Sequence, residues 1–188
     1  MNHHGTNNKA PGAKAMQLFQ QKKYNEALAE YKELLPSYSE LGFAYSMIAL
    51  CLLNLNKPRE ADNYIMQGIR AEAGRSQLYY IAALVKMQLK DTASSEKYVN
   101  EAIRINALNA DYHALLAGIQ LKRKEWRAAL ESANWGLGAE PGHSGCIQAK
   151  KDALKGAGRG GWIARQLGHL NHFLNLRLNM FKKQLLHK

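Results

Sequence analysis

The sequence has little cysteine, little proline and no long uninterrupted hydrophobic run. Its two cysteines, Cys51 and Cys146, lie far apart in the chain, so we expect free thiols rather than a disulfide, and a reducing, cytoplasmic setting. Only four prolines interrupt the 188 residues, which favours helix nearly throughout. The apolar stretches are broken short of the roughly 20 residues that a membrane span needs, and the polar opening "MNHHGTNNKAPG" is not a secretory signal.

Sequence motifs of catalysis are also missing. The chain has no phosphate-binding loop, no His-Glu-x-x-His and no Cys-x-x-Cys. The glycines of "GAGRGG", residues 156–161, follow no expected strand, which argues against a phosphate-binding loop there. His169 and His172 lie three residues apart but have no third ligand nearby in the pattern. We therefore expect neither an enzyme nor a bound metal or cofactor.

Acidic residues are absent from the C-terminal part of the chain. Residues 153–188 contain seven basic residues and no acidic one, so they carry +7 of the net charge of +11. In the rest of the chain, basic residues are scattered among acids, as on solvated helix faces. This mixture argues against nucleic-acid binding by that part of the protein.

A period of 34 residues runs through the remainder. The stretches that begin at Tyr24, Pro58, Thr92 and Trp126 align without a gap. Mostly small residues recur at this period, in the series Ala15, Ala49, Ala83 and Ala117; Ala27, Ala61, Ser95 and Ala129; Tyr31, Ile65, Val99 and Ala133; and Leu34, Gly68, Ala102 and Gly136. Small residues allow two helices to cross closely, and each unit gains burial by stacking on the next, so the period predicts stacked helix pairs rather than one compact core.

The helices and domains follow from this period. Helices are expected over residues 11–22, 24–35, 41–55, 58–72, 76–89, 94–105, 110–122, 125–139 and 144–154, the last without a partner helix. Pro36 should end the second helix, and Pro58 should begin the fourth. The expected domains are a mobile leader at 1–10, a helical solenoid at 11–155, a glycine-rich linker at 156–161 and a basic amphipathic helix at 162–188.

Residues 110–143, "ADYHALLAGIQLKRKEWRAALESANWGLGAEPGH", resemble a whole unit of the tetratricopeptide repeat family, and residues 42–75 and 76–109 resemble it less closely. The resemblance covers about residues 11–155. It implies an all-α, right-handed solenoid of about four helix pairs. It also implies a non-catalytic scaffold or adaptor that holds a peptide or a partner helix in a concave groove.

In this family the groove is lined by the exposed side of the first helix of each pair. The resemblance therefore implies these groove residues: Phe43, Ser46, Asn54, Gln77, Tyr80, Leu84, Met87, Gln88, Asp111 and Lys122. For Leu50, Leu53 and Leu84 a place in the core fits the pattern equally well. The surface is mixed and partly apolar, which suits an amphipathic helix or an extended apolar peptide. Lys122 is the only basic residue among these expected groove positions, which argues against the clamp that some members use for a terminal carboxylate.

Three further residues invite a functional interpretation, and we expect all three to be structural. His113 stands where the preceding units have Tyr45 and Tyr79, so it should pack at a helix crossing. Trp126 and Trp135 should close the packing between units rather than stack on a base.

Residues 162–188 have their own pattern. An apolar stripe recurs at spacings of three and four, at Ile163, Leu167, Leu170, Leu174, Leu178, Phe181 and Leu185, and Arg165, Arg177, Lys182 and Lys183 leave the remainder basic. The stripe can pack on the solenoid, pair with another chain or lie on an anionic membrane, or the segment can be foreign to the repeat fold. The linker favours docking on the same chain because it gives a high effective concentration. The alternative function is that of a protein that associates with a membrane surface or nucleic acid through this tail.

Overall fold

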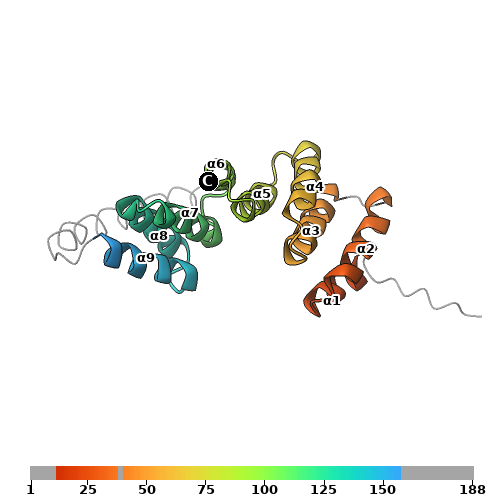
Figure 1. Cartoon of the computed structure of the whole chain (residues 1–188), viewed down its shortest axis with the longest axis horizontal. Helices are drawn as coiled ribbons and strands as arrows, with labels where there is room; N and C mark the ends of the chain where they lie inside the picture. The colour runs from red at the N-terminus through yellow and green to blue at the C-terminus, as the bar shows by residue number, and fades with distance from the viewer. Residues whose placement is uncertain (1–11, 38–39, 158–188) are drawn as a thin grey trace, which may run out of the picture. The chain divides into compact units, whose positions relative to one another are not determined.

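The computed structural model describes residues 12–37 and 40–157, and within them it consists of α-helices and one short 3-10 helix, joined by short turns (Figure 1). The elements are α1 (Ala13–Gln20), α2 (Tyr24–Leu34), the 3-10 helix η1 (Leu35–Ser37), α3 (Leu41–Asn54), α4 (Pro58–Ala71), α5 (Ser76–Gln88), α6 (Thr92–Ile105), α7 (Ala110–Lys122), α8 (Trp126–Ala139) and α9 (Ser144–Gly156). The nine α-helices of the described residues are packed in consecutive pairs. The all-α, paired-helix architecture expected from the sequence is thus confirmed.

The helix ends differ from the expected ones by one or two residues. The first helix begins at Ala13, after Gly12 in the left-handed conformation, and α6 begins at Thr92 rather than at residue 94. Pro36 does not end a helix abruptly, because the last turn of α2 tightens into η1, which contains this proline. The last helix continues to Gly156. The expected leader at 1–10 and the helix at 162–188 lie outside the described residues.

The 34-residue period corresponds to close helix crossings. Ala15, Ala49, Ala83 and Ala117 are completely buried, and so are Ala27, Ala61, Ser95 and Ala129. At Gly68 of α4, an added Cβ would lie 2.9 Å from Cβ of Tyr45 on α3 and 2.8 Å from Cδ2 of Leu78 on α5. A larger residue at such positions would hold the helices apart, which explains why the buried stripe is built from small side chains.

The period also recurs in the backbone of the turns. Lys22, Asn56, Lys90 and Lys124 have positive φ angles of 61°, 58°, 64° and 61°, and each stands 34 residues after the one before. Each follows the first helix of a pair and reverses the chain into the second. Lysine is a costly residue in this left-handed conformation, in which glycine and asparagine are more usual.

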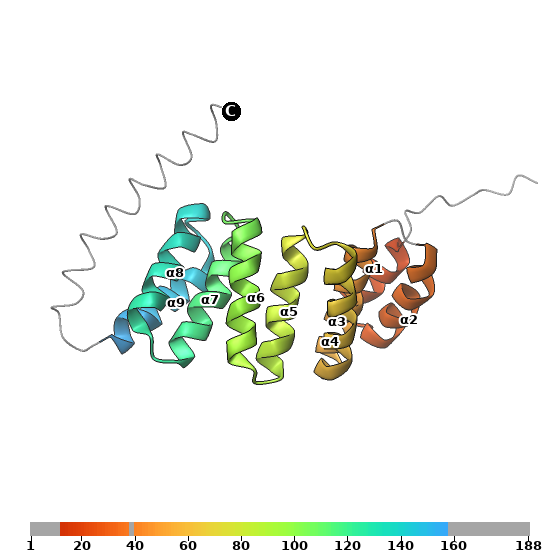
Figure 2. The same cartoon turned by 90° about the horizontal axis from the view of Figure 1, so that it is seen from above.

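The described residues form two compact units, with the boundary inside α6 between Tyr98 and Val99. In unit 1, α3 packs between α2 and α4 and also contacts α5. Figure 2 shows α3 and α4 side by side in this unit. Its core combines the small residues with larger buried side chains, among them Tyr31, Ile48, Leu52, Ile65 and Leu78.

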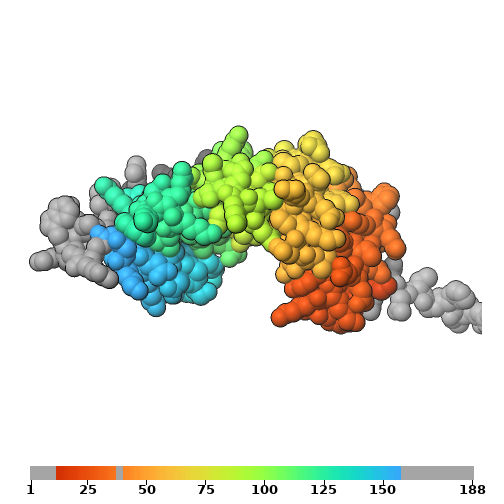
Figure 3. Space-filling view, in the orientation of Figure 1, coloured from red at the N-terminus to blue at the C-terminus, as the bar shows by residue number. Residues whose placement is uncertain are grey.

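Unit 2 contains the end of α6 together with α7, α8 and α9. Helix α9 packs against both α7 and α8 and lies beside them at the surface in Figure 3. Two polar side chains are buried between α7 and α8, where the Ser132 hydroxyl donates a hydrogen bond of 2.7 Å to Oε1 of Gln120. The pairing satisfies both groups away from water, so it fixes the register of the two helices as well as stabilising them.

Candidate binding surfaces

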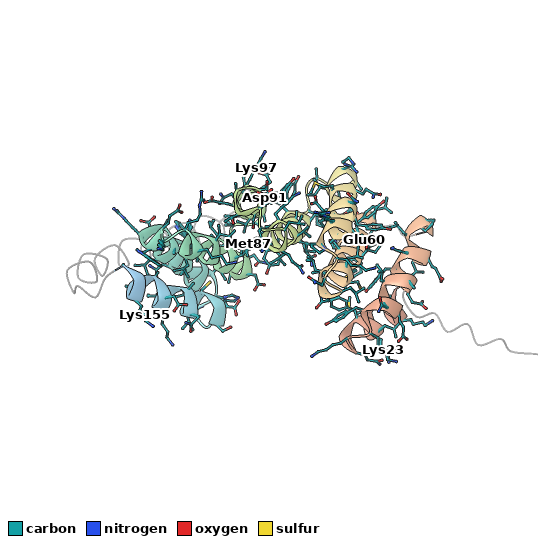
Figure 4. All side chains as sticks on the ribbon, in the orientation of Figure 1. Lys23, Glu60, Met87, Asp91, Lys97 and Lys155 are labelled. Atoms are coloured by element: carbon teal, nitrogen blue, oxygen red, sulfur yellow. The ribbon has the colours of Figure 1, made fainter. Side chains whose placement is uncertain are left out.

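The expected groove residues of unit 1 come from α3 and α5, the first helices of two consecutive pairs. On α5, Tyr80, Leu84 and Met87 follow one another at helical spacing and all three are half-buried, while Gln77 and Gln88 are exposed. Figure 4 labels Met87 on this helix. The combination of partly exposed apolar side chains with polar neighbours is the surface on which a peptide can bury apolar groups.

On α3 the expected residues have three different environments. Asn54 is exposed, and its Nδ2 donates to the carbonyl oxygen of Leu50 at 2.8 Å. Phe43 is half-buried and packs edge-to-face on Tyr31 of the core, with ring centroids 6.5 Å apart, so it is partly a core residue. Ser46 is completely buried.

The placement of Ser46 corrects the sequence expectation. Its hydroxyl donates a hydrogen bond of 2.8 Å to the carbonyl oxygen of Gly42, one turn earlier in the same helix. A serine can satisfy its hydroxyl in this way inside a helix, so its polarity alone does not indicate exposure. Ser46 therefore does not line a binding surface. Leu50 and Leu53, which the pattern left open, are half-buried and pack against the core of unit 1.

Gln88 ties α5 to the turn before α4. Its Nε2 donates to Oδ1 of Asn56 at 2.9 Å and lies 3.5 Å from the carbonyl oxygen of Leu53. Two residues earlier on α5, Lys86 forms a largely buried ion pair of 2.7 Å with Asp62 of α4. These polar contacts position α5, which carries the half-buried apolar residues, on the rest of unit 1.

Unit 2 contributes Asp111 and Lys122, both exposed, at the two ends of α7. No sequence pattern indicates a partner for Asp111, yet His143 Nε2 lies 3.1 Å from its Oδ1. His143 also caps α9, because its Nδ1 accepts the backbone N–H of Cys146 at 3.2 Å. A ring nitrogen that accepts this N–H leaves the other to donate to Asp111, so one neutral tautomer satisfies both contacts.

His113 and the cysteines behave as expected. His113 is buried at the crossing with α8, where a Cβ on Gly136 would stand 3.1 Å from its Cβ, and its Nε2 lies 2.9 Å from the Ala107 carbonyl oxygen. Burial lowers the pKa of His113, and the hydrogen bond to Ala107 partly opposes this. Cys51 and Cys146 are free and buried, and burial raises the pKa of each thiol to about 11.

A pocket that the sequence did not suggest lies in unit 2, between α6, α7 and α8. Its volume is about 390 Å³, and its walls include Ile103, Leu116 and Trp135, with the Gln120–Ser132 pair also in the lining. Trp135 is 38% exposed, so it does not close the packing between neighbouring repeats as the sequence predicted. Trp126 does pack closely, since a Cβ on Gly156 would lie 2.6 Å from its Cδ2. Periodicity does not distinguish the two tryptophans, because whether a groove stays open depends on the neighbouring helices.

Membrane spans and metal sites were sought in the same residues. No helix in residues 12–37 or 40–157 is long and apolar enough to cross a membrane. Within those ranges, no three or more histidine, cysteine or acidic side chains gather as a metal ion would require.

The chain has consecutive helix pairs, small buried residues at the helix crossings, and turns that recur every 34 residues. These features define a helical repeat protein of the solenoid class. The sequence model of the tetratricopeptide repeat matches residues 44–74 and 76–107. The chain therefore contains tetratricopeptide repeats. Comparison with curated protein sequences finds no match.

Solved structures share the fold at low sequence identity. A MamA crystal structure has 16% identity and a TM-score of 0.66, with 90% of each chain covered. YrrB, described as a tetratricopeptide repeat protein with an unusual peptide-binding site, has 18% identity and a TM-score of 0.58 over 76% of this chain and 78% of its own. The first such domain of Spaghetti (RPAP3), bound to the HSP90 peptide SRMEEVD, has 16% identity and a TM-score of 0.59 over 63% of this chain and 94% of its own.

Proposed function

We propose that this protein is a scaffold or adaptor that binds an apolar or amphipathic segment of a partner protein on the first-helix surface of unit 1. The row of Tyr80, Leu84 and Met87 on α5 carries the proposal, because it presents partly exposed apolar side chains at the spacing that a peptide or helix can follow. A methionine and an aromatic residue suit a surface that adapts to its partner. The fold is typically non-catalytic, which agrees with a binding function.

Two structural relatives support this class of function. YrrB is described by its peptide-binding site, and the Spaghetti domain was solved with a bound peptide. That peptide ends in the acidic sequence EEVD, whereas the α5 row contains no basic residue, and Lys122 belongs to unit 2. We therefore propose an apolar contact with the partner rather than a carboxylate clamp.

The test is affinity capture of partners by the full chain and by Leu84→Glu, which places a charge in the middle of the α5 row. Ala93→Glu is the matched control, because it adds the same charge at an exposed position on α6. This helix is the second of its pair, and Ala93 lies in the part of it that belongs to unit 1. We expect the Leu84 variant to lose the partners that the Ala93 variant retains. Equal retention by both variants contradicts the proposal.

The alternative function acts through the basic tail, and the same experiment separates it. Removal of residues 162–188 should leave capture by the α5 row unchanged. A tail-driven protein should instead lose its partner or membrane on this deletion and show binding that weakens steeply with salt, because its contacts are mainly electrostatic.

A further inference from the structure

The pocket of unit 2 has a partly apolar rim, which the described residues leave open. Trp135 of α8 stands at this rim with 38% of its surface exposed, and Ile103 and Leu116 provide apolar wall on α6 and α7. The volume of about 390 Å³ lies within the range of roughly 300–1,000 Å³ that is usual for pockets that hold a ligand. Tryptophan at the edge of an open pocket is a frequent anchor of binding.

A candidate occupant is present in the same chain. The stripe that includes Ile163, Leu167, Leu170 and Leu174 belongs to residues 162–188, outside the described residues. An apolar stripe of this length is unfavourable in water, so we expect it to be covered. A four-residue link, 158–161, joins it to the last described residue, Ala157, so its local concentration around unit 2 is high.

The end of α9 lies beside a second pocket that adjoins the first. Gly156 abuts the ring of Trp126 at the start of α8. Trp126 lines a second, more open pocket of about 600 Å³, which shares Ala128 and Glu131 with the first. From Trp126 to Trp135 the helix rises roughly 14 Å at 1.5 Å per residue. The stretch from Ala157 to Ile163 can span about 20 Å, so the first residue of the stripe reaches the pocket.

Charge distinguishes this pocket from the surface of α9, which also lies close to the point where the chain leaves that helix. The end of α9 exposes Lys151, Asp152 and Lys155 beside Leu154, so its net charge is positive, which disfavours a segment that has basic residues and no acidic one. The pocket between α6 and α8 has Glu131 in its lining. Its ion pair with Arg127 is 3.5 Å long and solvent-exposed, so it is weak and leaves the carboxylate able to attract a basic segment.

We propose that residues 162–188 fold back over α8 and place their apolar stripe in the pocket between α6, α7 and α8 of the same chain. The stripe covers Trp135, and the basic side of the segment faces Glu131 and solvent. The site lies on unit 2, so the proposal is independent of peptide binding on α5.

The test uses the full chain with Trp135 as its sole tryptophan, obtained with Trp126→Phe and Trp162→Phe. Leu170→Asp combined with Leu174→Asp then places two charges in the stripe. We expect the Trp135 emission to shift to the red and its quenching by acrylamide to increase, because the cover over the indole is lost. The matched control is Asn175→Asp with Asn179→Asp, which adds the same charges on the opposite side of the helical pattern and should leave both readouts unchanged.

A charge reversal locates the docking site. In the same background, Glu131→Lys should also increase the quenching of Trp135, since it repels the basic segment. Glu140→Lys should not, because Glu140 is exposed at the end of α8 and lines neither pocket.

Three results would overturn the proposal. Equal quenching of Trp135 in the stripe variant and its background would show that the stripe does not cover the pocket. Protection that grows with protein concentration would assign the cover to a second copy of the chain. Protection that develops only on addition of vesicles of phosphatidylcholine and phosphatidylserine would assign the stripe to a membrane.

Discussion

Gly136 of α8 lies so close to Cys146 of α9 that a Cβ atom on the glycine would overlap the cysteine sulfur. The same Cβ would stand 3.4 Å from the carbonyl oxygen of Ala110, to which the Cys146 thiol donates a hydrogen bond of 3.4 Å. A glycine in the middle of a helix is ordinarily unfavourable, so its presence here reflects the closeness of α7, α8 and α9.

This closeness predicts opposite effects for two glycine substitutions. Gly136→Ala should destabilise unit 2 by about 1–3 kcal/mol, because the added methyl group overpacks the crossing. Gly118→Ala is the matched control, since Gly118 lies inside α7 with nothing within 4 Å of an added Cβ. It should stabilise by about 0.5–1 kcal/mol through helix propensity. Urea unfolding of both variants measures the two effects, and equal stability would contradict the packing described here.

The turn lysines predict a stabilising substitution. Lys90 has a φ of 64°, and relief of the left-handed strain by Lys90→Gly should outweigh the extra flexibility of glycine in the unfolded chain. We expect a gain of up to about 1 kcal/mol in the free energy of unfolding. Lys97→Gly, at an exposed position inside α6, should cost about 1 kcal/mol instead. Thermal unfolding distinguishes them, and destabilisation by both would show that the turn is not strained.

The two thiols should report on the two units. Cys51 lies in α3 of unit 1 and Cys146 in α9 of unit 2, and burial raises the pKa of both to about 11. Near pH 8 the reactive thiolate is therefore scarce, and both should resist maleimide until their own unit unfolds. Mass spectrometry of labelled protein across a urea series gives the unfolding of each unit. Rapid labelling of either thiol in the native protein would contradict its burial.

The buried imidazole predicts a pH dependence. The pKa of His113 is lowered below its usual 6.5 because burial disfavours the charged ring. The unfolded chain then binds a proton at higher pH than the folded one does. The stability that His113 contributes is complete above about pH 6.5 and decreases as the pH falls toward the lowered value. His113→Tyr installs the residue found at this register in the two preceding repeats. It should reduce the loss of stability between neutral pH and pH 5. An unchanged pH profile in this variant would exclude His113 as a cause.

The sequence predicted the repeats well because their cause is local and periodic. A small residue every 34 positions leads directly to close helix crossings, and Ala49, Ala83 and Ala117 are all completely buried. The binding surface was harder to predict, since exposure at a given register depends on which neighbours cover it. Ser46 looked like a surface residue but satisfies its hydroxyl inside α3, and Trp135 looked like a packing residue but remains partly open. The contact from His143 to Asp111 joins two helices through a capping residue, which periodicity does not reveal.

Hydrogen exchange of the full chain, alone and with the partner that it captures, is the most direct test of peptide binding on the first-helix surface of unit 1. Binding along Tyr80, Leu84 and Met87 should slow the exchange of amides in α5 and in the adjoining part of α3, and leave α8 unchanged. Protection confined to α8 or to residues 162–188, with α5 exchanging as in the free protein, would contradict the account.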